Sequence, residues 1–320
     1  MIDFTNAAVK NKTYAGANGS KISIVYNGEQ YMLKFPPFPT INKEMSYTNS
    51  CISEYLGCKI FESVGIPVQE TLIGTYTSKG KEKIVVACKD FTSQGITLQD
   101  FASLKNRIID SERNGYGTEL GDILSTIDEQ TSMDSETLKT RFWDMFIIDA
   151  FIGNWDRHNG NWGFLYNNAT DEVTLAPVFD CGSSLYPQAD EDTMKAILTD
   201  KNELNHRVFD IPLSAITYNG KKINYFKFLS EGEFSDCNKA LKRISDRIDM
   251  NKIYEIIDST PTITQMQKEF YKTMLATVYK GNIIKNLIMD CQSYTKYRPN
   301  ETTGGIFVSW RRKEELPTGA

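Results

Sequence analysis

The sequence predicts an α+β protein in two parts: a small N-terminal part rich in strands with one helix, and a larger, mainly helical remainder. Two β-prone runs, 21–26 and 30–35, flank Asn27-Gly28, a dipeptide typical of tight hairpin turns because both residues tolerate positive φ. After about residue 90, strand patterns fade and apolar residues recur at helical spacing, most clearly over 135–152. We therefore predict an N-terminal lobe at 1–90 and a C-terminal lobe at 91–320.

The remaining elements follow from the same patterns. Residues 48–64 are predicted to form a helix, because Ile52, Leu56 and Ile60 repeat at helical spacing and Gly65 and Pro67 then stop it. Strands are expected at 68–74 and 84–88, on either side of a polar turn. In the C-terminal lobe we expect helices at 98–109, 119–127, 135–152, 194–198, 238–248 and 266–289, short strands at 163–166 and 173–176, and a loosely held polar tail at 296–320.

Length and composition describe an ordinary globular chain. With 320 residues, 40% of them hydrophobic and 24% charged, the protein can bury a sizeable core. No apolar run approaches the length of a membrane span, and residues 1–6 show no secretory signal. The net charge of −5 disfavours nucleic acid as a partner. The six cysteines show no close pairing, so we expect neither a zinc site nor a disulfide framework, and a reducing, cytoplasmic setting.

One polar stretch, 154–163, follows the most apolar helical run of the chain. It contains Asp156 and, five residues later, Asn161, and Asp180 then opens an Asp-Cys-Gly turn. This is the spacing that kinases use: one carboxylate orients the accepting hydroxyl, while an Asn and a further Asp hold Mg²⁺, which prefers oxygen ligands. The spacing alone is more often only a polar loop. The flanking apolar helix, the Asp-Cys-Gly turn and an upstream lysine favour a site.

That lysine is Lys34, at the end of the second predicted strand. A lysine there is usually a solvated surface residue; the alternative is the phosphate-contacting lysine of a kinase strand, which needs a carboxylate partner on the following helix. Glu54 lies on the helix predicted at 48–64, although it stands off the apolar line, where a glutamate is more often a surface charge. The sequence predicts the pair and leaves the surface alternative open.

Two further segments are candidates for nucleotide contacts. The small-residue loop before the first strand of the hairpin could cover phosphates with its backbone N–H groups, or be a plain turn. Its candidate residues are Gly16, Ala17, Asn18, Gly19, Ser20 and Lys21. Ala87, Cys88 and Lys89 close the strand predicted at 84–88, where the backbone of a two-lobed kinase meets adenine; an ordinary strand end is the alternative.

These blocks together resemble the HipA-like serine/threonine kinases. The resemblance covers about residues 13–182, and is carried by 15–21, 31–36, 54–55, 65–68, 154–161 and 175–180. It implies a two-lobed protein-kinase-like fold, ATP and Mg²⁺ as cofactors, and transfer of the γ-phosphoryl group to a serine or threonine of a protein substrate. By the same resemblance, Lys34 contacts phosphates, Asp156 orients the hydroxyl, Asn161 and Asp180 bind metal, His158 joins the nucleotide-contacting residues, and Thr13 is a candidate for autophosphorylation.

Two alternatives remain open. The Asp-Arg-His order of 156–158 also resembles phosphoinositide kinases, so a lipid or small-molecule kinase is the first alternative, although no basic membrane-facing segment is visible. A pseudokinase that binds nucleotide without transfer is the second, and it would be expected to lack one of Lys34, Asp156, Asn161 or Asp180. The sequence leaves the substrate, the oligomeric state and delivery to host cells open, the last being raised by resemblance alone.

Overall fold

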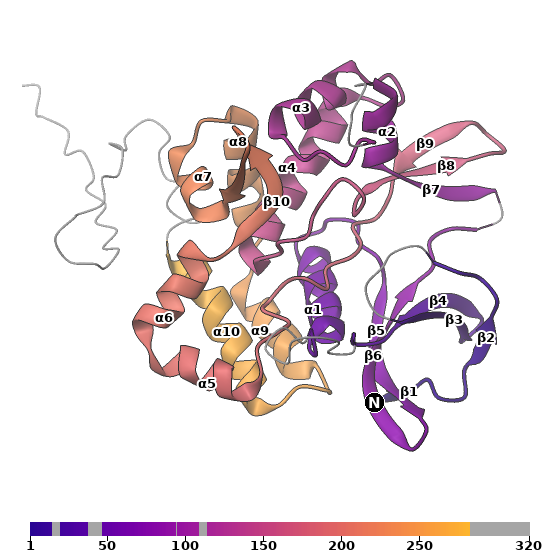
Figure 1. Cartoon of the computed structure of the whole chain (residues 1–320), viewed down its shortest axis with the longest axis vertical. Coiled ribbons are helices and arrows are strands. Elements are labelled where there is room, and N and C mark those ends of the chain that lie inside the picture. The colour runs from indigo at the N-terminus through magenta and orange to yellow at the C-terminus, as the bar shows by residue number, and fades with distance from the viewer. Residues whose placement is uncertain (15–19, 38–46, 94, 109–113, 282–320) are drawn as a thin grey trace, which may run out of the picture.

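The computed structural model describes residues 1–14, 20–37, 47–93, 95–108 and 114–281 of the chain. It confirms the predicted α+β architecture: a curled sheet with one long helix beside it forms one end of the molecule, and a mainly helical body forms the other (Figure 1). The polar tail predicted at 296–320 lies outside the described residues. The division at residue 90 stays a prediction, although the last strand of the N-terminal sheet ends at Lys89.

The N-terminal sheet has six strands in the order β1-β5-β6-β4-β3-β2, and only the β1–β5 pair is parallel. The strands are β1 (Ile2–Asp3), β2 (Ala8–Lys10), β3 (Lys21–Tyr26), β4 (Glu29–Lys34), β5 (Thr71–Ser78) and β6 (Lys81–Lys89). The predicted hairpin is β3–β4, and its turn residues Asn27 and Gly28 have φ of 51° and 82°. Lys21 and Lys34 are cross-strand partners at the open end of this hairpin.

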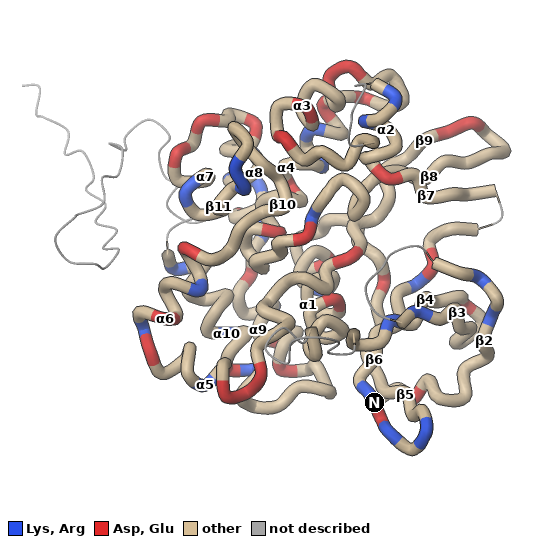
Figure 2. Tube along the Cα trace, in the orientation of Figure 1, with Lys and Arg blue, Asp and Glu red and all other residues tan. Residues whose placement is uncertain are grey.

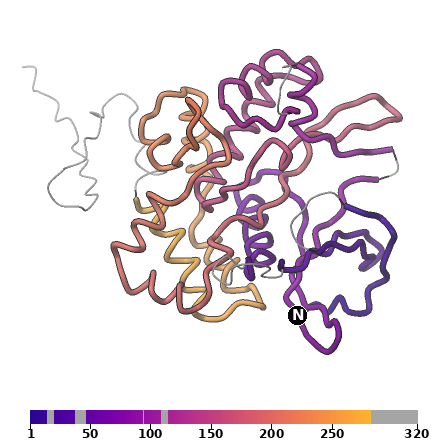
Figure 3. The backbone as a smooth tube through the Cα atoms, viewed as in Figure 1, coloured from indigo at the N-terminus to yellow at the C-terminus, as the bar shows by residue number. Residues whose placement is uncertain are grey.

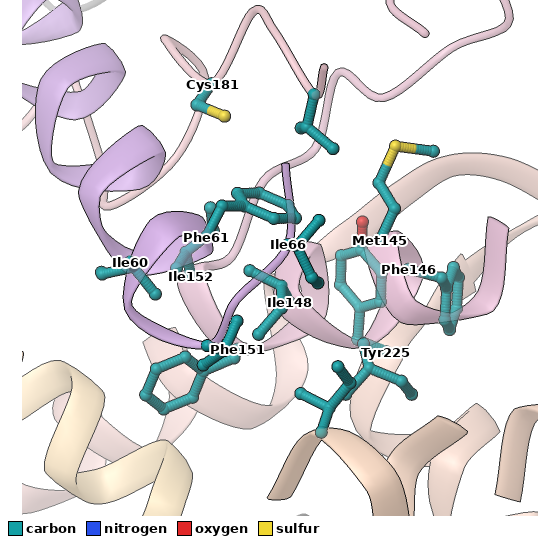
Figure 4. Close-up of a cluster of buried hydrophobic side chains, with 14 of the residues drawn as sticks. Ile60, Phe61, Ile66, Met145, Phe146, Ile148, Phe151, Ile152, Cys181 and Tyr225 are labelled. Atoms are coloured by element: carbon teal, nitrogen blue, oxygen red, sulfur yellow. The ribbon is translucent and has the colours of Figure 1, made fainter. Parts of the chain in front are cut away.

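Helix α1 (Ser50–Ser63), predicted at 48–64, packs against β5 and β6 on one side and α9 (Met250–Ser259) on the other. Its residues Ile60 and Phe61 belong to the same buried cluster as Phe151 and Ile152 of α4 (Ser135–Ile152). Figure 4 shows this cluster, with Cys181 beside α1. The helix therefore joins the sheet to the helical body through one continuous core.

The helical body is built around α4, whose bounds are those predicted. Asp134 caps its first turn by accepting from the Thr137 N–H, and Gly153 ends it with φ of 65°. The other helices are α2 (Phe101–Ile108), α3 (Leu120–Glu129), α5 (Glu191–Thr199), α6 (Lys201–Asn205), a π-helical turn η2 (His206–Asp210), α7 (Tyr225–Glu231), α8 (Ser235–Ser245) and α10 (Gln265–Lys280). The helices predicted at 119–127, 194–198 and 238–248 are α3, α5 and α8, shifted or extended by a few residues.

Two small sheets complete the body. In the first, β7 (Ile96–Asp100) pairs with β8 (Gly163–Asn167), which pairs with β9 (Glu172–Leu175). The prediction of helix from residue 98 was therefore wrong for 98–100, which extend along β8. In the second, β10 (Leu213–Tyr218) and β11 (Lys221–Asn224) form a hairpin where we expected only helices, and its turn is again Asn-Gly, with φ of 54° and 74° at Asn219 and Gly220.

Charged residues are spread over the molecule, whereas the described cysteines lie in its interior. Acidic and basic residues are interspersed along the trace of both lobes (Figure 2). The five cysteines within the described ranges are all free and buried. Across the described residues, no helix combines the length and the apolar character needed to cross a bilayer.

Candidate active site

Three charged side chains predicted to serve a nucleotide meet between the sheet and the helical body. Lys34, the last residue of β4, places its Nζ 2.9 Å from Glu54 Oε2 on α1 and 3.0 Å from Asp180 Oδ1. The segment that carries Asp156 and Asp180 runs between the N-terminal sheet and the C-terminal helices (Figure 3). The ion-paired group therefore joins the two lobes.

The surface alternatives for Lys34 and Glu54 are wrong. Their side chains are only 15% and 2% exposed. Glu54 sits on the part of α1 that packs toward the sheet, and its Oε1 accepts a second hydrogen bond from the Cys181 N–H at 3.2 Å. A buried carboxylate needs such partners to stay ionised. The sequence placed Glu54 correctly on α1. The apolar residues at helical spacing did not show that position 54 is buried as well.

The charges of this group are fixed by their mutual contacts. Burial lowers the pKa of Lys34, but the carboxylates of Asp180 and Glu54 outweigh it and hold that pKa well above the ordinary value. The Lys34 charge in turn lowers the pKa of Asp180 to about 2. At neutral pH the lysine is thus protonated and Asp180 is ionised, and the Asp180 side chain is still 42% exposed. It can accept a further cationic partner.

The turn that presents Asp180 is held tightly against α1. Asp180 itself has φ of 59°, in the left-handed region where aspartate is tolerated better than most residues. A Cβ added at Gly57 of α1 would lie 2.7 Å from Cys181 Cβ, and one added at Gly182 would lie 3.1 Å from Glu54 Oε2. The close approach of α1 and the Asp-Cys-Gly turn therefore requires glycine at position 57 and leaves little room for a side chain at position 182.

The loop after α4 presents Asp156 and Asn161. Asp156 is half-buried, and its N–H is held by the side chain of Asn154 at 3.2 Å. The Asn161 side-chain amide donates to the Asp156 carbonyl oxygen at 2.8 Å. Burial raises the pKa of the Asp156 carboxyl; the nearby charge of His158 opposes this, and that of Asp180 reinforces it. The Asp180 charge therefore acts on the carboxyl of Asp156.

The donor set fits a hard divalent cation. Because Asn161 uses its N–H₂ group within the loop, its carbonyl oxygen is left for a ligand, and no described residue donates to Asp180 Oδ2. Among the described residues no three His, Cys, Asp and Glu side chains gather into a metal cage. One amide and one carboxylate oxygen match Mg²⁺ rather than a caged metal, since Mg²⁺ keeps waters and phosphate oxygens in its shell.

A second ion pair, which the sequence analysis missed, lies beneath the loop. Arg157 Nε donates to Asp149 Oδ2 at 2.9 Å, and both side chains are almost fully buried, 2% and 1% exposed. The same guanidinium donates to the carbonyls of Asn161, at 2.7 Å, and of Phe179. It thereby ties the Asp156 loop to the residue just before Asp180. The available signal was an acidic residue, Asp149, inside the most apolar run of the chain.

The candidate phosphate loop is only partly described. Gly16, Ala17, Asn18 and Gly19 lie outside the described residues. Ser20 is exposed, and its carbonyl accepts from the Phe35 N–H at 3.0 Å. Lys21 is half-buried opposite Lys34, and its pKa is lowered by burial and by the Lys34 charge. Two lysines thus face the same region of the site.

The adenine contact predicted for Ala87, Cys88 and Lys89 finds no support. Strand β6 has β4 on one side and β5 on the other over these residues, so their backbone groups belong to the sheet ladder. The Lys89 N–H, for example, donates to the Glu70 carbonyl at 2.8 Å. Ala87 and Cys88 are also fully buried. A backbone contact with adenine would have to come from residues after the strand.

The remaining candidates are His158 and Thr13. His158 Nδ1 accepts from the Gly160 N–H at 3.0 Å, which leaves the other edge of the ring for a ligand near Asp156. Thr13 is exposed between Lys12 and Tyr14, whose side chains both bond to Asp90 Oδ2, at 2.5 and 2.7 Å. The segment before the phosphate loop is therefore anchored at the end of β6, with Thr13 accessible.

Comparison with known proteins gives consistent results. The model of the family described as HipA-like C-terminal domain matches residues 9–259. The chain is 53% identical over 276 residues to the serine/threonine-protein kinase CtkA of Helicobacter pylori strain J99, across 86% of this chain and 84% of that protein. It resembles the crystal structure of a Helicobacter pylori proinflammatory kinase CtkA with a TM-score of 0.84 and 51% identity, across 90% of this chain and 96% of that one.

A more distant structure shares the fold. HipA of Shewanella oneidensis MR-1, in its complex with HipB and operator DNA, matches with a TM-score of 0.53 and 15% identity, across 87% of this chain and 68% of that one. The predicted two-lobed kinase fold is therefore confirmed. Because the family model covers most of the chain, the protein belongs to the family of HipA-like C-terminal domains.

Proposed function

We propose that this chain, a serine/threonine-protein kinase by its 53% identity to the Helicobacter enzyme, transfers the γ-phosphoryl group of ATP to a serine or threonine hydroxyl of a protein, with Mg²⁺ as cofactor. The observation that supports this best is the ion-paired group of Lys34, Glu54 and Asp180 next to Asp156. Phosphoryl transfer needs positioning and charge neutralisation more than covalent chemistry. This group provides fixed charges of both signs at one place.

On the nucleotide side, Lys34 would contact the phosphates. Glu54 holds its ammonium at 2.9 Å, so the cation is already oriented before a ligand arrives. Lys21, its cross-strand neighbour, would add a second positive charge. Asn161 and Asp180 would hold Mg²⁺, which when bound neutralises the charge of the phosphate oxygens.

On the acceptor side, Asp156 would accept a hydrogen bond from the substrate hydroxyl and take its proton during transfer. Its burial raises the pKa of the carboxyl, which makes the carboxylate a stronger base than a solvated aspartate. The Asp149–Arg157 pair would hold this loop in a fixed position relative to the Asp180 turn, because Arg157 donates to a backbone carbonyl of each segment. None of these roles requires the chain to form a covalent intermediate.

The first experiment incubates purified protein with γ-labelled ATP, Mg²⁺ and a generic serine/threonine acceptor. Asp156→Ala should reduce transfer by about 10²–10⁴-fold, the range for loss of a general base, while ATP binding stays close to that of the wild type. Asp192→Ala, an exposed aspartate on α5, is the matched control and should change neither. A loss of ATP binding in Asp156→Ala as large as its loss of transfer would contradict the assigned role.

The same reaction tests autophosphorylation. We propose Thr13 as an acceptor because it is exposed and lies three residues before Gly16, where the candidate phosphate loop begins. A tryptic map of the labelled protein should place label on the peptide that contains Thr13. Label elsewhere and none on Thr13 would reject this site without affecting the proposed activity.

The assay also separates the alternatives. Measurable Mg²⁺-ATP binding without label on any protein would overturn the proposal and leave a lipid or small-molecule kinase or a pseudokinase. Label on a phosphoinositide or a small hydroxyl compound would identify a lipid or small-molecule kinase. Lys34, Asp156, Asn161 and Asp180 are all present, which favours transfer over binding alone.

A further inference from the structure

We propose that Tyr116 and Asp100 select the protein substrate by binding an arginine side chain that lies a few residues from the acceptor serine or threonine. The inference rests on the proposed function, because it concerns the protein that receives the phosphoryl group. Tyr116 belongs to the segment between α2 and α3, and Asp100 ends β7. Neither was a candidate site residue in the sequence analysis.

Tyr116 contacts the loop that presents Asp156. Its ring centroid lies 6.4 Å from that of His158, and the two rings meet edge to face. A Cβ added at Gly160 would lie 3.1 Å from Tyr116 Cε1, so the phenol ring packs directly on that glycine. The His158 N–H donates to the Asp156 carbonyl at 2.9 Å, so the chain turns back on itself within two residues of Asp156. These contacts place the Tyr116 ring against the loop just after Asp156.

The segment that carries Tyr116 is fixed to the same loop. Asn159 is 1% exposed, and its Nδ2 donates to the carbonyls of Gly115 at 2.9 Å and Gly117 at 2.8 Å. The Asn159 carbonyl accepts from the Ala102 N–H of α2 at 3.0 Å. Gly115 has φ of 78°, and a Cβ there would lie 1.9 Å from the Ala102 carbonyl oxygen. The backbone on both sides of Tyr116 therefore has a defined position, as a specificity residue requires.

Asp100 places a carboxylate next to the Tyr116 ring. It pairs with Gly163 of β8, two residues after Asn161, so its position is also tied to the catalytic loop. Its Oδ1 accepts from the N–H and the hydroxyl of Ser103, at 2.8 and 2.6 Å, and thereby caps the first turn of α2. Among the described residues, Asp100 Oδ2 accepts only from the Tyr116 hydroxyl, at 3.5 Å. This second oxygen can accept from a cation.

An exposed aromatic ring beside an incompletely satisfied carboxylate is complementary to a guanidinium. Tyr116 is 54% exposed, the largest fraction among the aromatic side chains described as exposed. An arginine can stack its planar group on such a ring and donate two N–H groups to a carboxylate, whereas the ammonium of a lysine has no flat face. A glutamate would be repelled by Asp100. The pair should therefore favour arginine over lysine, and either over a neutral or acidic residue.

Tyr116 and Asp100 lie on the acceptor side of the site. Figure 1 shows α2 and β7 apart from the β3–β4 hairpin, which carries Lys34 and its nucleotide-side partners. Tyr116 contacts the residues two and four positions after Asp156. Since an extended peptide advances about 3.3–3.6 Å per residue, the arginine should lie about two to four positions from the acceptor hydroxyl.

The test uses the purified full-length chain and a set of serine peptides. Each peptide carries Arg, Lys, Ala or Glu at one position, taken in turn from four residues before the serine to four residues after it. An exposed cation–π contact and an exposed ion pair together correspond to about 3- to 30-fold in affinity. At one or two of these positions the wild type should prefer Arg over Ala by that factor in kcat/KM, mainly through KM.

Three variants test the two residues. Asp100→Asn keeps the cap of α2, because asparagine caps helices as well as aspartate, and should lower the Arg-to-Ala ratio by about 1.5- to 5-fold. Tyr116→Leu should lower it by about 2- to 5-fold, whereas Tyr116→Phe keeps the ring and should keep most of the ratio. Asp134→Asn is the matched control: Asp134 caps α4 through the same two bonds, from the N–H and hydroxyl of Thr137, and its variant should keep the wild-type ratio.

Each outcome decides the inference. An equal loss on the Arg and Ala peptides in Asp100→Asn and Tyr116→Leu would show a structural role and overturn it. A raised KM for ATP with an unchanged ratio would place the two residues on the nucleotide side and also overturn it, as would the same fall of the ratio in Asp134→Asn. Transfer by the wild type without a preference for Arg would reject this inference alone, whereas no transfer to any protein or peptide would reject the proposed function as well.

Discussion

Two groups of ion pairs lie in the candidate active site, and they differ in how much of their charge is left for a ligand. In the group around Lys34, Asp180 is 42% exposed and keeps one oxygen without a donor from the described residues. In the Asp149–Arg157 pair both side chains are nearly inaccessible. The guanidinium there also bonds to two backbone carbonyls, so its donors are used within the protein.

The difference separates a candidate ligand-binding group from a pair that supports the backbone. A pair with an accessible, incompletely satisfied carboxylate can rearrange when a cation or a phosphate arrives. A closed pair cannot, and its effect is to fix the backbone that carries the accessible groups. Replacing a closed pair with apolar residues is often neutral, but removing one partner leaves a buried charge without compensation. A substitution in the Asp149–Arg157 pair should therefore lower the stability of the fold, whereas a substitution in the group around Lys34 should weaken ligand binding.

The largest effect is expected from Arg157→Met. The substitution leaves the Asp149 carboxylate buried without its cation, and it removes the contacts to the carbonyls of Asn161 and Phe179. We expect the free energy of unfolding to fall by about 3–5 kcal/mol, as for other broken buried pairs. Urea denaturation followed by circular dichroism measures it.

The control for this prediction is Lys239→Met, which breaks a pair whose lysine is 70% exposed. Such pairs contribute about 0–1 kcal/mol, so its unfolding curve should nearly match that of the wild type. The double variant Asp149→Leu/Arg157→Met should recover part of the lost stability because it removes both charges. Similar small losses in both single variants would mean that Arg157 is not a structural support.

Asp180→Asn should affect ligand binding rather than folding. Its expected effect in free energy is smaller than that of Arg157→Met. The amide keeps the shape of the side chain and removes the accessible negative charge, so Mg²⁺-ATP should bind about 10- to 100-fold more weakly, or about 1.4–2.7 kcal/mol. The unfolding free energy without ligand should change little. Isothermal titration calorimetry with Mg²⁺-ATP measures the first quantity. Unchanged affinity would remove Asp180 from the metal site.

Local patterns in the sequence predicted much of this fold. Asn27-Gly28 predicted its hairpin, and the apolar residues at helical spacing over 135–152 predicted α4 with its observed bounds. Asn219-Gly220 is the same hairpin signal, but it was overlooked within a region expected to be helical. Strand β7 could not be found in this way, because it owes its conformation to pairing with β8 about 65 residues later rather than to its own alternation.

In the candidate site, too, local sequence patterns predicted some features, and contacts between distant segments determined the others. Spacing singled out Asp156, Asn161 and Asp180 as candidates, because kinase chemistry places these residue types at characteristic distances along the chain. It could not show that Glu54 is buried or that Arg157 and Asp149 pair, since burial and pairing depend on how α1 and α4 pack. The adenine contact at 87–89 stays a prediction without support, because β5, which lies at the strand predicted at 68–74, already pairs with Ala87 and Cys88.

The smallest expected effect is a pH dependence that belongs to the accessible group. Lys34 lowers the pKa of Asp180 from 3.8 to about 2, so the ionised carboxylate stabilises the folded state above pH 3.8, and this stabilisation is lost as the pH falls toward 2. Asp180→Asn cannot titrate at this position. Without metal or nucleotide, the wild type should therefore melt slightly above the variant at pH 5, by no more than the few degrees that about 1 kcal/mol represents for a chain of this size. The difference should shrink as the pH is lowered from 4 to 2.5, when both proteins are followed by thermal melts in the same buffers. A difference that stays constant or grows toward acid would show that Lys34 does not hold the Asp180 charge in the folded protein.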